Sequence, residues 1–203
     1  LHLSIRRQRQ MCIRDRSRLS DPYFSINKNR RSPMLRTLVA AKRAGQIGTV
    51  GDLRLLEEFI ANDGLRGGVT YLNTLVPHRF TAVYRKRRDV MYCMSAFDIE
   101  GEIFGPDLQS VPVCDSYCQF VLKDGVFVTE DARRESVLDG HKYQKALLSY
   151  VGQPIYLSNG ETYGTLCHFD FLERKVSAQQ QEFFASAVRV IAAAAEKAST
   201  SAA

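Results

Sequence analysis

The segment that decides the fold of this chain is SYVGQPIYLSNGETYGTLCHFD, residues 149–170. It contains two runs rich in strand-forming residues, 149–157 and 161–170, on either side of Asn159-Gly160. An Asn-Gly pair accepts the positive φ angles that a tight hairpin turn requires. The two runs are therefore predicted to pair as neighbouring antiparallel strands in a fixed register.

Three residues of this segment have positional meaning. Gly152 and Gly164 lie inside the two strands, where a missing side chain usually reports the close packing of a helix or a ligand. Asp170 ends the second strand, and its carboxylate is expected to fix the following turn by accepting hydrogen bonds from backbone amides.

A second hairpin is predicted upstream. Phe80, Ala82 and Tyr84 alternate with polar or opposite-facing residues, and residues 90–97 are again rich in strand formers. The tip at 86–89 carries a run of cations, which we expect to be solvated and to discourage edge pairing rather than to bind phosphate.

The segment between the two hairpins is predicted to contain a helix, a short strand and a loop. Pro112 suits the first turn of a helix over 112–121, and a short strand follows over 126–130. Residues 131–141 are polar and irregular, so they are expected to form a loop.

Helices are predicted at both ends of the chain. One helix covers 35–44, a second is capped by Asp52, and a third runs over 67–76. Ser177 and Gln180 form a capping box for a last helix over 178–197. Two adjacent rows of that helix are apolar, which favours a homodimer through the terminal helices. One row is Phe184, Val188, Ile191 and Ala195, and the other is Phe183, Ala187, Val190 and Ala194. The order of elements lacks a regular strand-helix alternation, so the fold class is α+β with an antiparallel sheet.

The positive charge of the chain is concentrated at its start. Of 28 Lys and Arg and 22 Asp and Glu, nine basic and two acidic residues fall in 1–33, and the remainder is almost neutral. Residues 6–15, RRQRQMCIRD, resemble the translation of a transposase adaptor used for sequencing libraries. We therefore interpret 1–33 as a disordered, non-native scar with read-through. The alternative is a basic nucleic-acid arm or a transit peptide.

The rest of the chain is predicted to consist of three parts. Residues 34–63 form an N-terminal helical extension, 64–198 the main domain, and 199–203 a disordered tail. Cysteines in this part lack zinc or disulfide-scaffold spacing, and no apolar run is long enough to span a membrane. We expect a cytoplasmic protein that binds neither nucleic acid nor membrane.

Several of these motifs occur together in one known family. The YVGQPI, NGE and GTLC elements of 150–167, followed by Asp170, resemble the last strands of GAF domains such as those of bacterial signalling proteins. Weaker matches are RFTAVYR at 79–85, DSYC at 115–118 and the strand near Phe127. The resemblance covers roughly residues 64–196.

The resemblance implies a six-stranded antiparallel sheet, related to that of profilin and PAS domains, with the terminal helices on one face. The other face is expected to hold a ligand pocket beneath a crossing helix. GAF domains bind small molecules such as cyclic nucleotides or metabolites, or partner proteins, and fold alone does not choose among these. On this resemblance the pocket residues are Tyr117, Cys118, Phe120, Asp131, Arg133, Tyr150, Cys167 and His168.

The chemical candidates have alternatives. Cys114 and Cys118 are spaced i, i+4 on the predicted helix, which suits core packing, thiol chemistry or a shared metal. Asp131 and Arg133 open the polar loop, where an arginine can clamp a phosphate or stay solvated. His168 is either a ligand contact or a bystander. No phosphate-binding glycine loop, nucleophile elbow or HExxH motif occurs in the sequence.

The sequence thus predicts a non-catalytic GAF-type sensory domain for signal transduction, with no metal and an unknown cofactor. One alternative is a thiol oxidoreductase of the same fold, similar to free methionine sulfoxide reductases, in which Cys118 and Cys167 meet. The other is a degenerate domain with a filled pocket that serves only as a protein-interaction scaffold.

Overall fold

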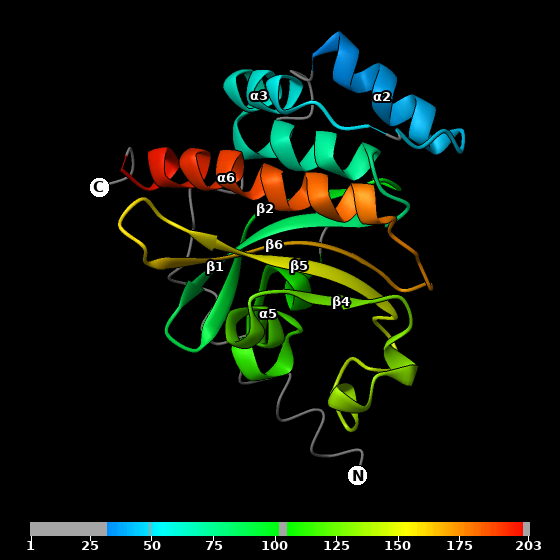
Figure 1. Cartoon of the computed structure of the whole chain (residues 1–203), viewed down its shortest axis with the longest axis vertical. Coiled ribbons are helices and arrows are strands. Elements are labelled where there is room, and N and C mark those ends of the chain that lie inside the picture. Colours follow the sequence, from blue (N-terminus) through cyan, green and yellow to red (C-terminus); the bar gives the residue numbers. More distant parts are fainter. Residues whose placement is uncertain (1–31, 49, 102–104, 201–203) are drawn as a thin grey trace.

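A six-stranded sheet lies at the centre of the computed structural model, which describes residues 32–48, 50–101 and 105–200 (Figure 1). The strands are β1 (Phe80–Arg87), β2 (Val90–Asp98), β3 (Ser110–Pro112), β4 (Phe127–Thr129), β5 (Ser149–Tyr156) and β6 (Thr162–Asp170). Their order across the sheet is β3-β2-β1-β6-β5-β4, and every neighbouring pair is antiparallel. The predicted α+β class is confirmed.

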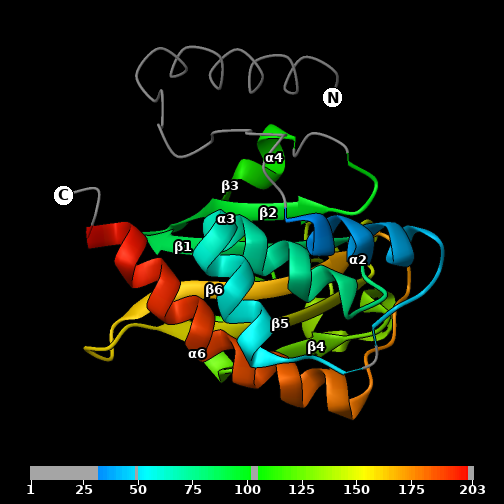
Figure 2. The same cartoon turned by 90° about the horizontal axis from the view of Figure 1, so that it is seen from above.

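The longer helices share one face of the sheet. They are α2 (Pro33–Arg43), α3 (Leu53–Thr74) and α6 (Ala178–Thr200), and Figure 2 shows α3 and α6 crossing the strands on the same side. The short helix α5 (Cys118–Asp124) lies on the other side, while α4 (Pro106–Gln109) accompanies β3 beside β2. The sheet therefore separates two apolar layers.

Strand alternation assigns side chains to these layers. The helix-side core includes Leu56, Phe59, Leu72, Val83, Leu166, Phe184 and Ile191. The core on the α5 side includes Phe80, Ala82, Tyr84, Tyr117, Val121, Tyr150 and Phe169. Leu35 and Val39 of α2 belong to the helix-side core, so the predicted N-terminal extension packs into the same core as the strands.

The β5–β6 hairpin confirms the prediction made from residues 149–170. Ser149 pairs with Asp170, and Gly160 takes the predicted positive φ of 83° at the turn. A Cβ at Gly152 would lie 2.5 Å from the Tyr150 ring and 2.6 Å from Val121 of α5, and one at Gly164 would collide with the carbonyl oxygen of Tyr84. Both glycines permit close approaches that a side chain would block.

Asp170 fixes the end of β6, as predicted. Its carboxylate accepts hydrogen bonds from the amides of Arg79 and Leu172, both at 3.0 Å, and from Arg174 Nε at 2.8 Å. The group is buried, so these three donors compensate the loss of water around the carboxylate.

The helix boundaries follow the predicted caps. The Asp52 side chain accepts a hydrogen bond from the Arg54 amide and starts α3, and Ser177 and Gln180 exchange the two bonds of a capping box before α6. The predicted second and third helices are the two halves of α3, which meet at Gly64 (φ 63°, ψ −155°). The proposed boundary at 63/64 coincides with this kink.

The helix predicted over 112–121 is wrong. Ser110–Pro112 forms β3, Val113–Asp115 a 3₁₀ turn, and only Cys118 onward is α-helical. Pro112 lies in the edge strand, where a missing N–H breaks no ladder bond, and the extended backbone of Ser116 interrupts any helix. Cys114 and Cys118 therefore do not share a helix face: Cys114 is exposed and Cys118 is buried.

The remaining predictions at the ends have different outcomes. Residues 1–31, which include the adaptor-like stretch, and 201–203 of the predicted tail lie outside the described residues. Helix α6 continues to Thr200, beyond the predicted end at 197. Among the described helices, none combines the length and apolar character that crossing a membrane requires.

Candidate ligand site

A cavity of about 330 Å³ lies on the α5 side of the sheet. Three strands supply its floor through Tyr84 of β1, Tyr150 of β5, and Cys167 and Phe169 of β6. Pairing of Tyr150 with Phe169 and of Gly152 with Cys167 holds these side chains on one face. The remaining wall comes from Gly105, Leu108, Val111, Ser116, Tyr117, Cys118, Tyr143, Ala146, Leu147 and Phe171.

Three phenols of the cavity wall already take part in hydrogen bonds. The Tyr84 hydroxyl donates to the carbonyl oxygen of Leu108 at 2.8 Å, and the Tyr117 hydroxyl donates to that of Leu147 at 3.1 Å. Burial raises the pKa of the Tyr84, Tyr117 and Tyr150 phenols, so all three stay protonated near neutral pH. None of the described residues that line the cavity is an acid, a lysine or an arginine.

Two free thiols form the most distinctive chemical group of this wall. Cys118 starts α5, and its sulfur lies 3.2 Å from the donating Thr165 hydroxyl and 3.4 Å from the Tyr150 hydroxyl. Hydrogen bonding lowers the pKa of Cys118 to about 7, and Cys167 is the partner with the largest effect. Thr165, Tyr150 and Ser116 lower the pKa further, whereas burial opposes them by raising it. Burial raises the pKa of Cys167, so Cys118 holds the thiolate of the pair.

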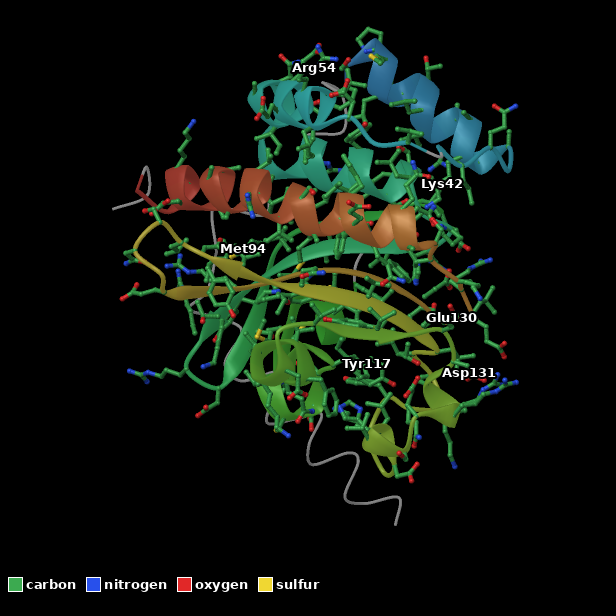
Figure 3. All side chains as sticks on the ribbon, viewed as in Figure 1. Lys42, Arg54, Met94, Tyr117, Glu130 and Asp131 are labelled. Carbon is green, nitrogen blue, oxygen red and sulfur yellow. The ribbon has the colours of Figure 1, made fainter. Side chains whose placement is uncertain are left out.

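The structure brings together four of the eight predicted pocket residues. Tyr117, Cys118, Tyr150 and Cys167 line the cavity. Figure 3 shows Tyr117 beneath the sheet, on the side of α5. Phe120 faces away from the cavity lining and packs on Phe127, with ring centroids 4.9 Å apart.

The loop pair Asp131 and Arg133 lies elsewhere. The Asp131 carboxylate caps a 3₁₀ turn and accepts two hydrogen bonds from the Arg133 guanidinium, at 2.7 and 3.0 Å, which lower its pKa. Arg133 also pairs with Glu173. This guanidinium is already held by two carboxylates, which disfavours the phosphate clamp considered from the sequence.

His168 lies on the opposite face of the sheet. Its neighbours Cys167 and Phe169 point into the cavity, so strand alternation directs His168 toward the helices. On that face its ring packs against the ring of Phe184, with the two ring centroids 4.3 Å apart. The expectation that Cys167 and His168 line one pocket is therefore corrected.

Sequence reasoning missed several wall residues. Tyr84 shares its strand face with Phe80 and Ala82, so the alternation noted in the sequence was a sufficient signal for it. Leu108 lies in the one-turn helix α4, Tyr143 in a turn and Phe171 just after β6, and none of these short segments has a periodicity that identifies the facing side. Within the described ranges, no cluster of three or more His, Cys, Asp or Glu side chains is arranged to hold a metal ion.

Many solved structures share this architecture, and those named here are distant in sequence. The GAF domain of an Acinetobacter phosphoenolpyruvate-protein phosphotransferase aligns with a TM-score of 0.58 at 13% identity, over 83% of this chain and 96% of that one. The chain has a GAF-like fold.

Two further structures show how widely this GAF-like fold is used. Free methionine-R-sulfoxide reductase from Neisseria meningitidis, solved with its substrate, matches with a TM-score of 0.58 and 14% identity over 80% of this chain and 93% of that one. The phycocyanobilin-bound GAF domain of a cyanobacterial phytochrome matches with a TM-score of 0.52 and 18% identity, over 80% of this chain and 92% of that one.

Comparisons at the level of sequence add nothing to this assignment. No model of a known protein family matches the chain, and no curated protein matches it. At these identities the likeness fixes the fold, which both non-catalytic sensory domains and reductases share.

Proposed function

We propose that this chain is a non-catalytic sensory domain of signal transduction that binds a small molecule in the cavity between α5 and the sheet. The observation that carries the proposal is the cavity itself, about 330 Å³ in volume and lined by aromatic and aliphatic side chains. Ligand sites usually measure about 300 to 1,000 Å³ and are mostly apolar. A cavity of this size favours ligand binding over the alternative of a filled, purely scaffolding domain.

The wall chemistry favours an uncharged ligand. Phosphate and carboxylate groups are recognised by arginine, lysine or free backbone amides, and no basic side chain is among the described residues of the wall. The hydroxyl groups of Tyr84 and Tyr117 already donate their hydrogen bonds to backbone carbonyl oxygens. We therefore expect a compact, largely apolar metabolite rather than a cyclic nucleotide.

Strand β6 provides a route from the cavity to the terminal helices. Cys167 and Phe169 contact the cavity, and His168 between them packs on Phe184 of α6. A ligand that prefers one packing of these residues shifts the population of the helix arrangement that goes with it.

The helix-side surface supports the predicted homodimer. A groove between α3 and α6 is lined by Ile60, Leu65, Val190 and Ala194 among others. Symmetric association of two chains would cover these apolar residues. Light scattering during size exclusion should give a dimer mass; a monomer at micromolar concentration removes this part of the proposal.

A thermal-shift screen tests ligand binding. A ligand that binds only the native state raises the melting temperature, and a hit from neutral aromatic or aliphatic compounds is expected, with no shift from cyclic nucleotides. Ala146→Trp should abolish the shift because Ala146 is an exposed residue of the cavity wall. Ala185→Trp, an equally exposed change on α6, is the control. A shift that survives Ala146→Trp places the ligand elsewhere.

A thiol oxidoreductase is the second candidate, because Cys118 and Cys167 lie together in the cavity wall and are both free. The two thiols would reduce a sulfoxide to a sulfide, releasing the oxygen as water and leaving a Cys118–Cys167 disulfide for an added dithiol to reduce. Turnover of free methionine sulfoxide with dithiothreitol that disappears in Cys118→Ser supports this function. Absence of turnover in the wild-type protein removes it.

A further inference from the structure

A chain of buried hydrogen bonds crosses the helix side of the protein. Lys42 of α2 is 8% exposed, and its Nζ donates to the backbone and side-chain oxygens of Asn73, both at 2.7 Å, and to the carbonyl oxygen of His78 at 2.6 Å. Figure 3 shows Lys42 where α2 meets α3. From Asn73 the chain continues through Thr81 to His168, at 2.9 and 2.7 Å.

The direction of this chain is fixed by its acceptors. Asn73 Nδ2 lies 3.2 and 3.1 Å from the carbonyl oxygens of His78 and Arg79, which can only accept, so the amide places its nitrogen here and its oxygen toward Lys42. Asn73 Nδ2 therefore also donates to the Thr81 hydroxyl oxygen.

The tautomer of His168 follows from the same reasoning. The Thr81 hydroxyl accepts from Asn73, and the acceptor available to its own hydrogen in this chain is Nδ1 of His168. Burial, with Lys42 and His78 nearby, lowers the pKa of His168, so the ring is neutral. A neutral imidazole that accepts at Nδ1 carries its hydrogen on Nε2.

Nε2 lies on the distal edge of the ring, directed away from β6 and into the layer beneath the helices. A cavity of about 260 Å³ is present in that layer, and His168 lines it together with Leu72, Val76, Phe183 and Phe184. Val50 and Gly51 form part of its wall, and the ring of Phe183 abuts Gly51. The cavity is separated from the α5-side site by the whole thickness of the sheet.

We propose that this helix-side cavity is a second small-molecule site, and that His168 Nε2–H donates to a carbonyl or ether oxygen on an uncharged, otherwise apolar ligand. The apolar side chains of the wall give affinity, and the buried His168 donor gives orientation. Glu182 at the polar part of the wall disfavours a carboxylate ligand through charge repulsion. The volume lies below the usual range for drug-sized ligands, so the ligand is compact.

The first test is the tautomer, read by NMR of ¹⁵N-histidine-labelled protein at pH 6. His168 should show a pyridine-like Nδ1 and a pyrrole-like Nε2 that bears the hydrogen. The opposite tautomer overturns the proposal, because His168 would then present no donor to the cavity.

The second test compares acetophenone with ethylbenzene and benzoate as probes. Acetophenone should shift His168 Nε2 and the methyl signals of Leu72 and Val76. Ethylbenzene lacks the oxygen and should bind about two- to tenfold more weakly, the range for one neutral hydrogen bond. Benzoate should bind still more weakly. Equal binding of acetophenone and ethylbenzene, or shifts confined to Cys167 and Phe169, contradicts the proposal.

Variants locate the probe without disturbing the core. Val50→Trp, at a wall position that is 69% exposed, should block the cavity and remove the acetophenone shifts. Val137→Trp, at a position that is 56% exposed and outside the helix-side cavity, should leave them intact. A crystal soaked in acetophenone that shows only ordered water at His168 also overturns the proposal.

Discussion

Thr165→Val removes one hydrogen-bond donor from the Cys118 sulfur and leaves the shape of the side chain nearly unchanged. Thr165 is fully buried on β6, and its hydroxyl donates to Cys118 Sγ at 3.2 Å. The thiolate of Cys118 accepts this bond more strongly than the thiol does, so losing it must raise the pKa of Cys118.

The size of the effect follows from the energy of one bond. A hydrogen bond to a charged group contributes about 1.5 to 3 kcal/mol, and one pKa unit corresponds to about 1.36 kcal/mol. The pKa of Cys118, about 7 in the wild type, should therefore rise by about 1 to 2 units in Thr165→Val. A less acidic thiolate is also a better nucleophile, so alkylation at pH 7 slows only about two- to sixfold.

Alkylation by iodoacetamide across pH 5.5 to 9.5 measures this pKa, with the modified peptide quantified by mass spectrometry. Cys114, which is exposed, is quantified in the same sample as a check on the alkylation reaction. Thr129→Val is the matched control, because Thr129 is equally buried on β4 and its hydroxyl has no hydrogen-bond partner in the described structure.

Two results would refute this reasoning. A wild-type midpoint near the ordinary thiol pKa of about 8.5 means that the surrounding donors do not stabilise a thiolate at Cys118. An unchanged midpoint in Thr165→Val means that the Thr165 hydroxyl does not donate to the sulfur. Thr129→Val should leave the midpoint of Cys118 where it is, and a shift there would make the assay unspecific.

The remaining predictions concern stability. Burial lowers the pKa of Lys42 to about 7, so between pH 7 and about 10.5 the unfolded chain binds a proton that the folded chain lacks. The free energy of unfolding therefore rises with pH over this range. In denaturant titrations, Lys42→Met should lose this rise. Gly164→Ala should destabilise by at least about 2 kcal/mol because the new Cβ meets the backbone of Tyr84, whereas Gly105→Ala, with open space, should be near neutral. Asp170→Asn should lower the melting temperature by breaking the buried pair with Arg174; an unchanged value contradicts its role in the turn.

The fold could be predicted because its signals are local. Asn159-Gly160 specifies a turn, Gly152 and Gly164 mark close approaches, and Ser177 with Gln180 starts a helix, all within a few residues of chain. The wrong helix prediction over 112–121 also arose from a local signal. Pro112 suits a helix start and an edge strand equally well, and only the position of β3 at the edge of the sheet decides between them.

The site was predictable where strand alternation or the family resemblance reaches it, as for Tyr117 and Cys118. Tyr150 and Cys167 could be placed on one face, and so could Tyr84, but the wall contributed by Tyr143 and Phe171 depends on how turns fold back across the sheet. The thiol cluster is another such case. Cys118 and Thr165 are 47 residues apart in sequence, and only the packing of α5 on β6 brings them together.

Strand β6 of this chain presents different side chains to two layers. Its alternate residues face two layers, so Cys167 and Phe169 contact one cavity while His168 borders the other. The backbone pairing of β6 with β1 and β5 does not depend on these side chains, which makes them free to vary without loss of the fold. The solved structures of similar architecture, at 13 to 18% identity, fix that pairing and leave the chemistry open. In this chain the Thr165 and Tyr150 hydroxyls contact the Cys118 sulfur, and the pH dependence of Cys118 alkylation is therefore the measurement that separates a passive binding wall from a reactive one.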